Sequence, residues 1–152
     1  MNYIITDGRD NDFAMLCGML DDNLNDLVGG EKQREQYNQY NTLEKINHVI
    51  VLYDQEKPIG CAAFKHYDEG TAEMKRVFLD KTYRGHGYAK ELIKHLEELA
   101  RSVGYHSMLL ETGKPLAAAI GLYTTLGYQV IENYGQYQNL PLSVCMRKEL
   151  IK

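Results

Sequence analysis

The sequence predicts an α+β fold in which one mixed, mostly antiparallel sheet is flanked by helices. In the middle of the chain, three runs rich in β-branched and apolar residues are joined by short turns, which is typical of an antiparallel meander. Helical periodicity appears on both sides of this meander, and a strand, a long helix and a further strand follow it as in a parallel crossover unit. We expect about seven strands and about four helices in total.

The N-terminal part predicts one short strand followed by two helices. Residues 2–6 form the strand, and residues 10–28 place their apolar side chains at helical spacing until a glycine pair at 29–30. Residues 31–47 are polar, but tyrosine or aliphatic side chains recur there every three positions. This weaker pattern predicts a second helix over 31–47.

The remaining elements follow from alternating apolar runs and helical faces. The strands of the meander are expected at residues 48–53, 59–67 and 71–79. A broad apolar face from Ala89 to Val103 predicts a long helix that ends at Gly104. Further along we expect a strand at 107–111, a helix at 118–126, and strands at 128–134 and 142–147. Because no linker or repeat interrupts the chain, residues 1–152 are expected to form a single domain.

The overall composition excludes several classes of protein. Of the 152 residues, 44% are hydrophobic and 25% are charged, which is ordinary for a compact globular chain. The 17 basic and 21 acidic side chains give a net charge of −4, so the basic excess needed for non-specific nucleic-acid binding is missing. No apolar run approaches the ~20 residues of a membrane span, and the N-terminus resembles no secretory signal. We expect a cytoplasmic protein that binds neither nucleic acid nor membranes.

The cysteines and histidines show no metal-binding spacing. Cys17, Cys61 and Cys145 lie far apart, and neither a CxxC pair nor an HExxH motif occurs. We therefore predict no metal site and expect reduced, mostly buried thiols.

The most informative segment joins the strand at 71–79 to the long helix. Residues 77–89 read Val-Phe-Leu-Asp-Lys-Thr-Tyr-Arg-Gly-His-Gly-Tyr-Ala, so a loop with two glycines leads directly into a helix. The first turn of a helix has unpaired N–H groups and partial positive charge, and glycines let the backbone approach a bulky anion. The segment predicts a phosphate or pyrophosphate site, with a glycine turn that binds nothing as the alternative. The segment matches neither the loop of nucleoside triphosphate enzymes nor the fingerprint of dinucleotide-binding folds. A nicotinamide or nucleoside triphosphate enzyme is a third, less favoured interpretation.

Two blocks of the sequence resemble the GNAT family of N-acetyltransferases. Residues 84–89, Arg-Gly-His-Gly-Tyr-Ala, are similar to the family signature Arg/Gln-x-x-Gly-x-Gly/Ala, the loop that holds the pyrophosphate of acetyl-coenzyme A (acetyl-CoA). Residues 119–128 are similar to the family element Ala-x-x-x-Tyr-x-x-x-Gly-Phe/Tyr. The resemblance implies a GNAT-like fold with a splayed central pair of parallel strands, and acetyl-CoA as the acetyl donor. One departure is Leu116, where many members have an asparagine that contacts the cofactor arm.

The resemblance also implies roles for individual residues. Tyr123 takes the family position of the general acid that protonates the departing thiolate. Glu73 is the candidate base, with an exposed Glu–Lys pair formed with Lys75 as the alternative; His106 is a substitute base. Acyl-cysteine chemistry on Cys61 or Cys145 is a further alternative. The residues expected to contact acetyl-CoA are Val77, Phe78, Leu79, Arg84, Gly85, His86, Gly87, Tyr88, Ala89 and Lys90.

These features predict an enzyme that moves the acetyl group of acetyl-CoA directly to a primary amine through a ternary complex. Such an enzyme has to deprotonate the amine, because alkyl amines are mostly ammonium ions near neutral pH. The expected partner is an amine-bearing small molecule or peptide, and a homodimer is left open. The alternative is a module that binds an acyl-CoA as a sensor or interaction surface without transferring the acyl group.

Overall fold

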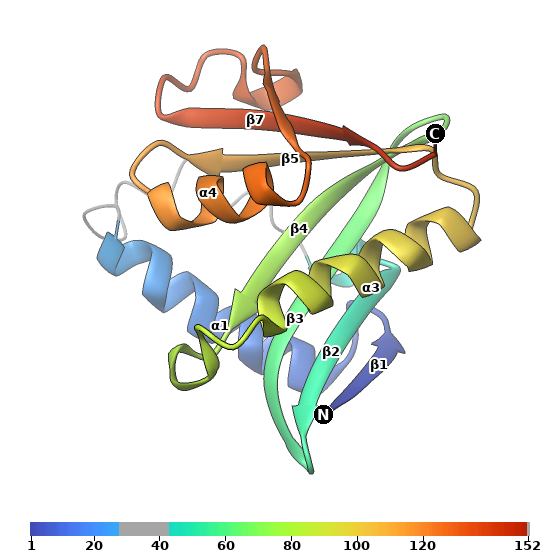
Figure 1. The fold of residues 1–152 in the computed structure, drawn as a ribbon, viewed down its shortest axis with the longest axis vertical. Coiled ribbons are helices and arrows are strands. Elements are labelled where there is room, and N and C mark those ends of the chain that lie inside the picture. Colours follow the sequence, from blue (N-terminus) through green and yellow to red (C-terminus); the bar gives the residue numbers. More distant parts are fainter. Residues whose placement is uncertain (28–42, 152) are drawn as a thin grey trace.

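The computed structural model describes residues 1–27 and 43–151, which are arranged around a seven-stranded sheet (Figure 1). The strands are β1 (Asn2–Thr6), β2 (His48–Asp54), β3 (Lys57–Asp68), β4 (Thr71–Leu79), β5 (Ser107–Gly113), β6 (Gln129–Ile131) and β7 (Ser143–Glu149). They are ordered β1-β2-β3-β4-β5-β7-β6, and each neighbouring pair is antiparallel except β4–β5. The predicted mixed, mostly antiparallel sheet is therefore confirmed, including the crossover from β4 to β5.

The described residues contain three α-helices, where about four were expected. These are α1 (Asn11–Leu27), α3 (Tyr88–Ser102) and α4 (Ala117–Thr125). The helix predicted over 31–47 lies mostly outside the described residues. Its described end is a single 3-10 turn, Leu43–Lys45, which leads almost at once into β2.

The helices cover both faces of the sheet. Because side chains alternate along a strand, Val49 and Val51 of β2 pack on the α1 side, whereas Ile50 and Leu52 pack on the side of α3. Helices α3 and α4 lie together on the face opposite α1 (Figure 1). No helix among the described residues is long and apolar enough to cross a membrane.

The parallel pair β4–β5 separates part-way along its length. The two strands pair only at Thr71–Ser107, Ala72–Met108 and Glu73–Leu109. Beyond these positions β4 continues with β3 as its neighbour, while β5 continues with β7. A bulge, in which residues 76 and 77 of β4 together oppose one residue of β3, bends the strand at this point. The sheet is therefore open between β4 and β5, as the family resemblance implied.

Candidate functional site

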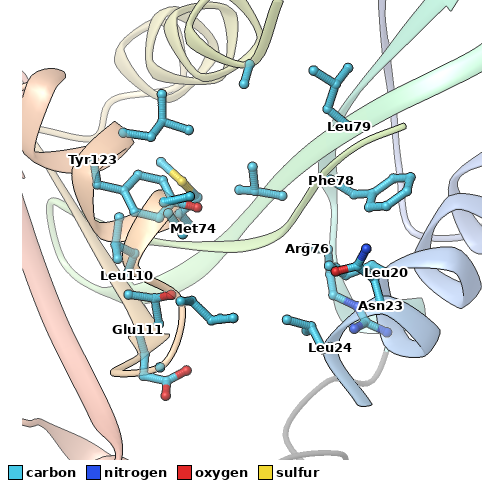
Figure 2. Close-up of a pocket in the computed structure, with 18 of the residues that line it drawn as sticks. Leu20, Asn23, Leu24, Met74, Arg76, Phe78, Leu79, Leu110, Glu111 and Tyr123 are labelled. Carbon is cyan, nitrogen blue, oxygen red and sulfur yellow. The ribbon is translucent and has the colours of Figure 1, made fainter. Parts of the chain in front are cut away.

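The opening between β4 and β5 forms a cleft with a volume of about 870 Å3 (Figure 2). Residues 74–79 of β4 form one wall and residues 110–113 of β5 form the other. The last turns of α1 contribute Leu20, Asn23 and Leu24, and α4 contributes Tyr123, which lies across the cleft from Phe78. Most of the lining is aliphatic or aromatic, with a few polar groups, which is the usual character of a small-molecule site.

At one end of the cleft, two glycines shape the start of α3. Gly85 has φ 85° and Gly87, the N-cap of α3, has φ 84°, a region that residues with a side chain rarely adopt. A Cβ atom at either position would have no atom within 4 Å, so both glycines border open space. The first helical hydrogen bond runs from the N–H of Glu91 to the carbonyl of Gly87, which leaves earlier N–H groups of this turn outside the helical ladder. This arrangement fits a pyrophosphate.

The loop before α3 is fixed by its own hydrogen bonds. The Arg84 Nε donates to the carbonyl oxygen of Leu79 at 3.1 Å, and Asp80 accepts bonds from the backbone N–H and the hydroxyl of Thr82. The Tyr83 hydroxyl donates to Asp54 at the end of β2. The loop is thereby held against the ends of β2 and β4.

The residues predicted to contact acetyl-CoA divide into two groups. The cleft itself is lined by Val77, Phe78, Leu79, Arg84 and Ala89. The others, Gly85, His86, Gly87, Tyr88 and Lys90, lie outside the lining, in the loop and first turn of α3. Leu116, which stands where many family members have an asparagine, also lines the cleft. It is the residue directly before α4.

Tyr123 extends from α4 into the cleft (Figure 2). Its side chain is 8% exposed and packs edge-on against Tyr128, with ring centroids 5.9 Å apart. Among the described residues no group is hydrogen-bonded to the Tyr123 hydroxyl, and burial alone raises its pKa. The phenol therefore stays protonated near neutral pH and is able to donate a proton.

Glu73 lies beside the cleft in a buried polar cluster and is not part of the lining. Its carboxylate is 2% exposed, accepts a 2.7 Å hydrogen bond from the Tyr134 hydroxyl, and lies 3.6 Å from the Lys75 ammonium. Lys75 does line the cleft and donates to the Tyr137 hydroxyl at 2.6 Å. Burial lowers the pKa of Lys75, while the neighbouring Glu73 opposes that shift. The Glu–Lys pair expected from strand alternation is thus present, but it is buried.

Glu111 is the carboxylate that borders the cleft directly, and it was not singled out from the sequence. It lies on β5, is half-buried, and accepts a 2.7 Å hydrogen bond from the Ser143 hydroxyl. Among the described lining residues it is the sole carboxylate. In the sequence, Glu111 is an acidic residue at the end of an otherwise apolar strand. That pattern indicates a cleft residue only once β5 is known to diverge from β4.

The remaining candidates lie away from the cleft. His106 is exposed between α3 and β5, and Cys61 and Cys145 are fully buried in the core outside the lining. Within residues 1–27 and 43–151 there is no group of three or more His, Cys, Asp or Glu side chains suited to a metal ion.

Comparisons of the sequence and of the structure with known proteins indicate the same family. The model of the acetyltransferase (GNAT) family matches residues 16–128. The chain is 34% identical over 118 residues to an IAA acetyltransferase from Azospirillum brasilense, covering 68% of this chain and 77% of that protein. It is also 34% identical, with a TM-score of 0.78 over 98% of both chains, to a structure from Klebsiella pneumoniae titled as an acyl-CoA N-acyltransferase. A GNAT acetyltransferase from Elizabethkingia anophelis with acetyl-CoA bound shares the fold, with a TM-score of 0.59 and 17% identity over 67% of this chain and 75% of that one.

Proposed function

Since this chain belongs to the acetyltransferase (GNAT) family and is an acetyl-CoA-dependent acyltransferase, we propose that it transfers the acetyl group directly to a primary amine while both substrates are bound. One observation carries the proposal. A single cleft connects the start of α3, which fits a pyrophosphate, with a polar cluster suited to an amine, and Tyr123 lies on its wall. Both substrates therefore have room in one continuous space.

The donor is proposed to bind along β4 and at the start of α3. Beyond Glu73, β4 has lost β5 as its neighbour, so the backbone of residues 77–79 presents an open edge to an extended ligand. The pantetheine arm of acetyl-CoA is such a ligand, and its pyrophosphate would be held by residues 84–90. This assignment uses backbone groups, and its main side-chain contribution is the positive charge of Arg84.

The acceptor amine has to lose a proton before it attacks the thioester. Among the described residues, two carboxylates lie near this part of the cleft, Glu73 and Glu111. Glu73 reaches the cleft only through Lys75, whereas Glu111 borders it. We favour Glu111 as the group that takes the proton and propose that Glu73 acts on the same site indirectly, through Lys75.

Tyr123 is proposed to complete the reaction as the general acid. When the new amide bond forms and the carbon–sulfur bond breaks, the thiolate of coenzyme A takes the phenol proton. The placement of the phenol on the wall of the cleft supports this role, and the raised pKa of Tyr123 means that the proton is present before the reaction begins. A covalent route through cysteine has less support, because Cys61 and Cys145 lie outside the cleft lining.

The acceptor belongs to the class of small-molecule or peptide amines. A screen that measures amine-dependent release of coenzyme A thiol, over aliphatic, aromatic and peptide amines, tests the proposal. We expect thiol release with at least one amine class and an acetylated product of matching mass. Tight acetyl-CoA binding by calorimetry with no thiol release above the amine-free control would instead support the sensor interpretation.

A further inference from the structure

The bulge of β4 contains an unusual backbone conformation. Arg76 has φ 58°, a left-handed conformation that side chains other than those of Asn and Asp seldom adopt. It lies at the bulge, just past the point where β4 loses β5 as its neighbour. Arg76 and Val77 both line the cleft. A strained peptide at this place requires contacts that hold it there.

The first contact fixes the side chain of Arg76. Its guanidinium is 7% exposed and forms a two-point ion pair with Asp21 of α1, through Nη1 at 2.7 Å and Nη2 at 3.0 Å. Such bidentate pairs fix both the position and the orientation of the guanidinium. Asp21 itself does not line the cleft. Helix α1 is thereby tied to the bulge of β4 by an ion pair whose carboxylate lies outside the cleft lining.

The second contact fixes the carbonyl of Arg76. The Cys61 thiol on β3 donates to this oxygen at 3.2 Å, and Cys61 belongs to the buried cluster on the α1 side of the sheet. No peptide bond among the described residues is cis, so the N–H of Val77 points opposite to that carbonyl and away from Cys61. The contact therefore determines the direction of the Val77 N–H.

We propose that Asp21, acting through Arg76, and Cys61 are positioning residues that hold the peptide between Arg76 and Val77 so that the Val77 N–H faces the acetyl carbonyl oxygen. This inference rests on the proposed acetyl transfer. Negative charge develops on that oxygen as the amine attacks, and a donor already in place stabilises it without reorganisation. Asp21 is thus coupled to the chemical step from outside the cleft.

The test begins with Asp21→Asn, which keeps the shape of the side chain and removes its charge. The matched control is Asp22→Asn, the same change at the next, exposed position of α1. We expect kcat to fall about tenfold in Asp21→Asn, less than the ~100-fold or greater loss typical of deleting a whole oxyanion donor. The KM for acetyl-CoA and its calorimetric Kd should stay within about twofold of the unaltered protein, as should all values for Asp22→Asn. An unchanged kcat in Asp21→Asn would overturn the proposal.

A second pair of variants separates positioning from general stability. Arg76→Gly keeps the left-handed backbone accessible but removes the link to Asp21. If Asp21 acts through Arg76, adding Asp21→Asn to Arg76→Gly lowers kcat no further. If the losses of kcat in the two single variants instead add up in the double variant, and parallel the fall in melting temperature, the role of Asp21 is purely structural. Cys61→Ser, which keeps a donor, should retain more activity than Cys61→Ala.

A measurement that does not need turnover keeps the inference separate from the proposed function. The Val77 amide signal in a nitrogen–proton NMR spectrum should be a single sharp peak in the unaltered protein. It should shift or broaden in Asp21→Asn and stay unchanged in Asp22→Asn. An unaltered protein that acetylates no amine would defeat the proposed function, whereas an unchanged Val77 signal in Asp21→Asn would defeat the positioning role.

Discussion

The two ends of the cleft are built in different ways. At the end near α3, the structure offers backbone groups: two glycines with positive φ, the first turn of a helix, and the open edge of β4. At the other end, it offers side chains from separate elements, with Lys75 from β4, Glu111 from β5 and Tyr137 from the segment after β6. Backbone groups suit the proposed binding of acetyl-CoA because they do not depend on the identity of the side chains, whereas the proposed acceptor site depends on three particular side chains.

Tyr123 lies on the wall of the cleft that connects the two ends, and its replacement should have the largest effect on turnover. Tyr123→Phe removes the proposed proton donor and leaves the ring in place, so we expect kcat to fall by roughly 100-fold or more. The calorimetric Kd of acetyl-CoA should change less than about twofold, because the phenol is proposed to act on the departing thiolate. Tyr105→Phe, a change of the same kind at a residue outside the cleft lining, is the control. A Tyr123→Phe enzyme with the original turnover would remove the proposed acid.

The acceptor end is tested by exchanging its two carboxylates separately. Glu111→Gln should lower kcat/KM by roughly 100-fold and abolish the acidic limb of the pH–rate profile, because it removes the sole carboxylate among the described residues that line the cleft. Glu73→Gln should have the smaller effect on rate and the larger effect on melting temperature, because it removes the negative charge 3.6 Å from the buried Lys75 ammonium. Rate profiles from pH 5 to 9 and thermal melts distinguish the two. The reverse pattern would restore Glu73 as the base.

The donor end should respond to a change in backbone freedom alone. Gly87→Ala adds a methyl group with no steric neighbour, but it penalises φ 84° by about 1–2 kcal/mol. We therefore expect the Kd of acetyl-CoA to rise by roughly tenfold. Gly18→Ala on the exposed face of α1, where a methyl group also meets nothing, should leave the Kd unchanged. Equal affinity in Gly87→Ala would mean that the start of α3 does not hold the pyrophosphate.

The smallest expected effect is a gain in affinity for acetyl-CoA when Leu116 is replaced. Leu116→Asn introduces the residue that many family members have at this position, on the wall of the cleft. One added hydrogen bond to the cofactor arm is worth about 0.5–1.5 kcal/mol, so acetyl-CoA should bind roughly two- to tenfold tighter. Leu116→Ala, which adds no polar group, serves as the comparison. If both variants bind alike, the arm does not pass Leu116.

The backbone geometry at the start of α3 is easier to predict from the sequence than the grouping of side chains at the other end of the cleft, for a physical reason. Gly85 and Gly87 indicate their turn geometry locally, because a glycine turn before a helix has few conformations. Glu111 and Tyr137 come together only when β5 diverges from β4 and the segment after β6 folds over it. The strand expected at 128–134 is accordingly shorter, Gln129–Ile131, and Tyr134 instead leads into the turn that carries Tyr137.

The bulge at Arg76 could not be predicted from the sequence either. Arginine gives no local signal for a left-handed backbone, and the conformation depends on Asp21 and Cys61, which are distant in the chain. The order of the elements, in contrast, could be predicted correctly because it depends on local sequence patterns. Strand alternation and helical faces are local patterns, and a long helix between two strands enforces the parallel pairing of β4 and β5.

The position of β7 between β5 and β6 has a consequence for how the protein is made. A ribosome produces residues 143–149 well after β5, yet these residues pair with the full length of β5, the strand that forms the second wall of the cleft. During synthesis that wall has neither β7 nor, beyond Glu73, β4 beside it. A nascent chain therefore completes the second wall of the cleft only after residues 143–149 have left the exit tunnel, well after the residues of the other wall.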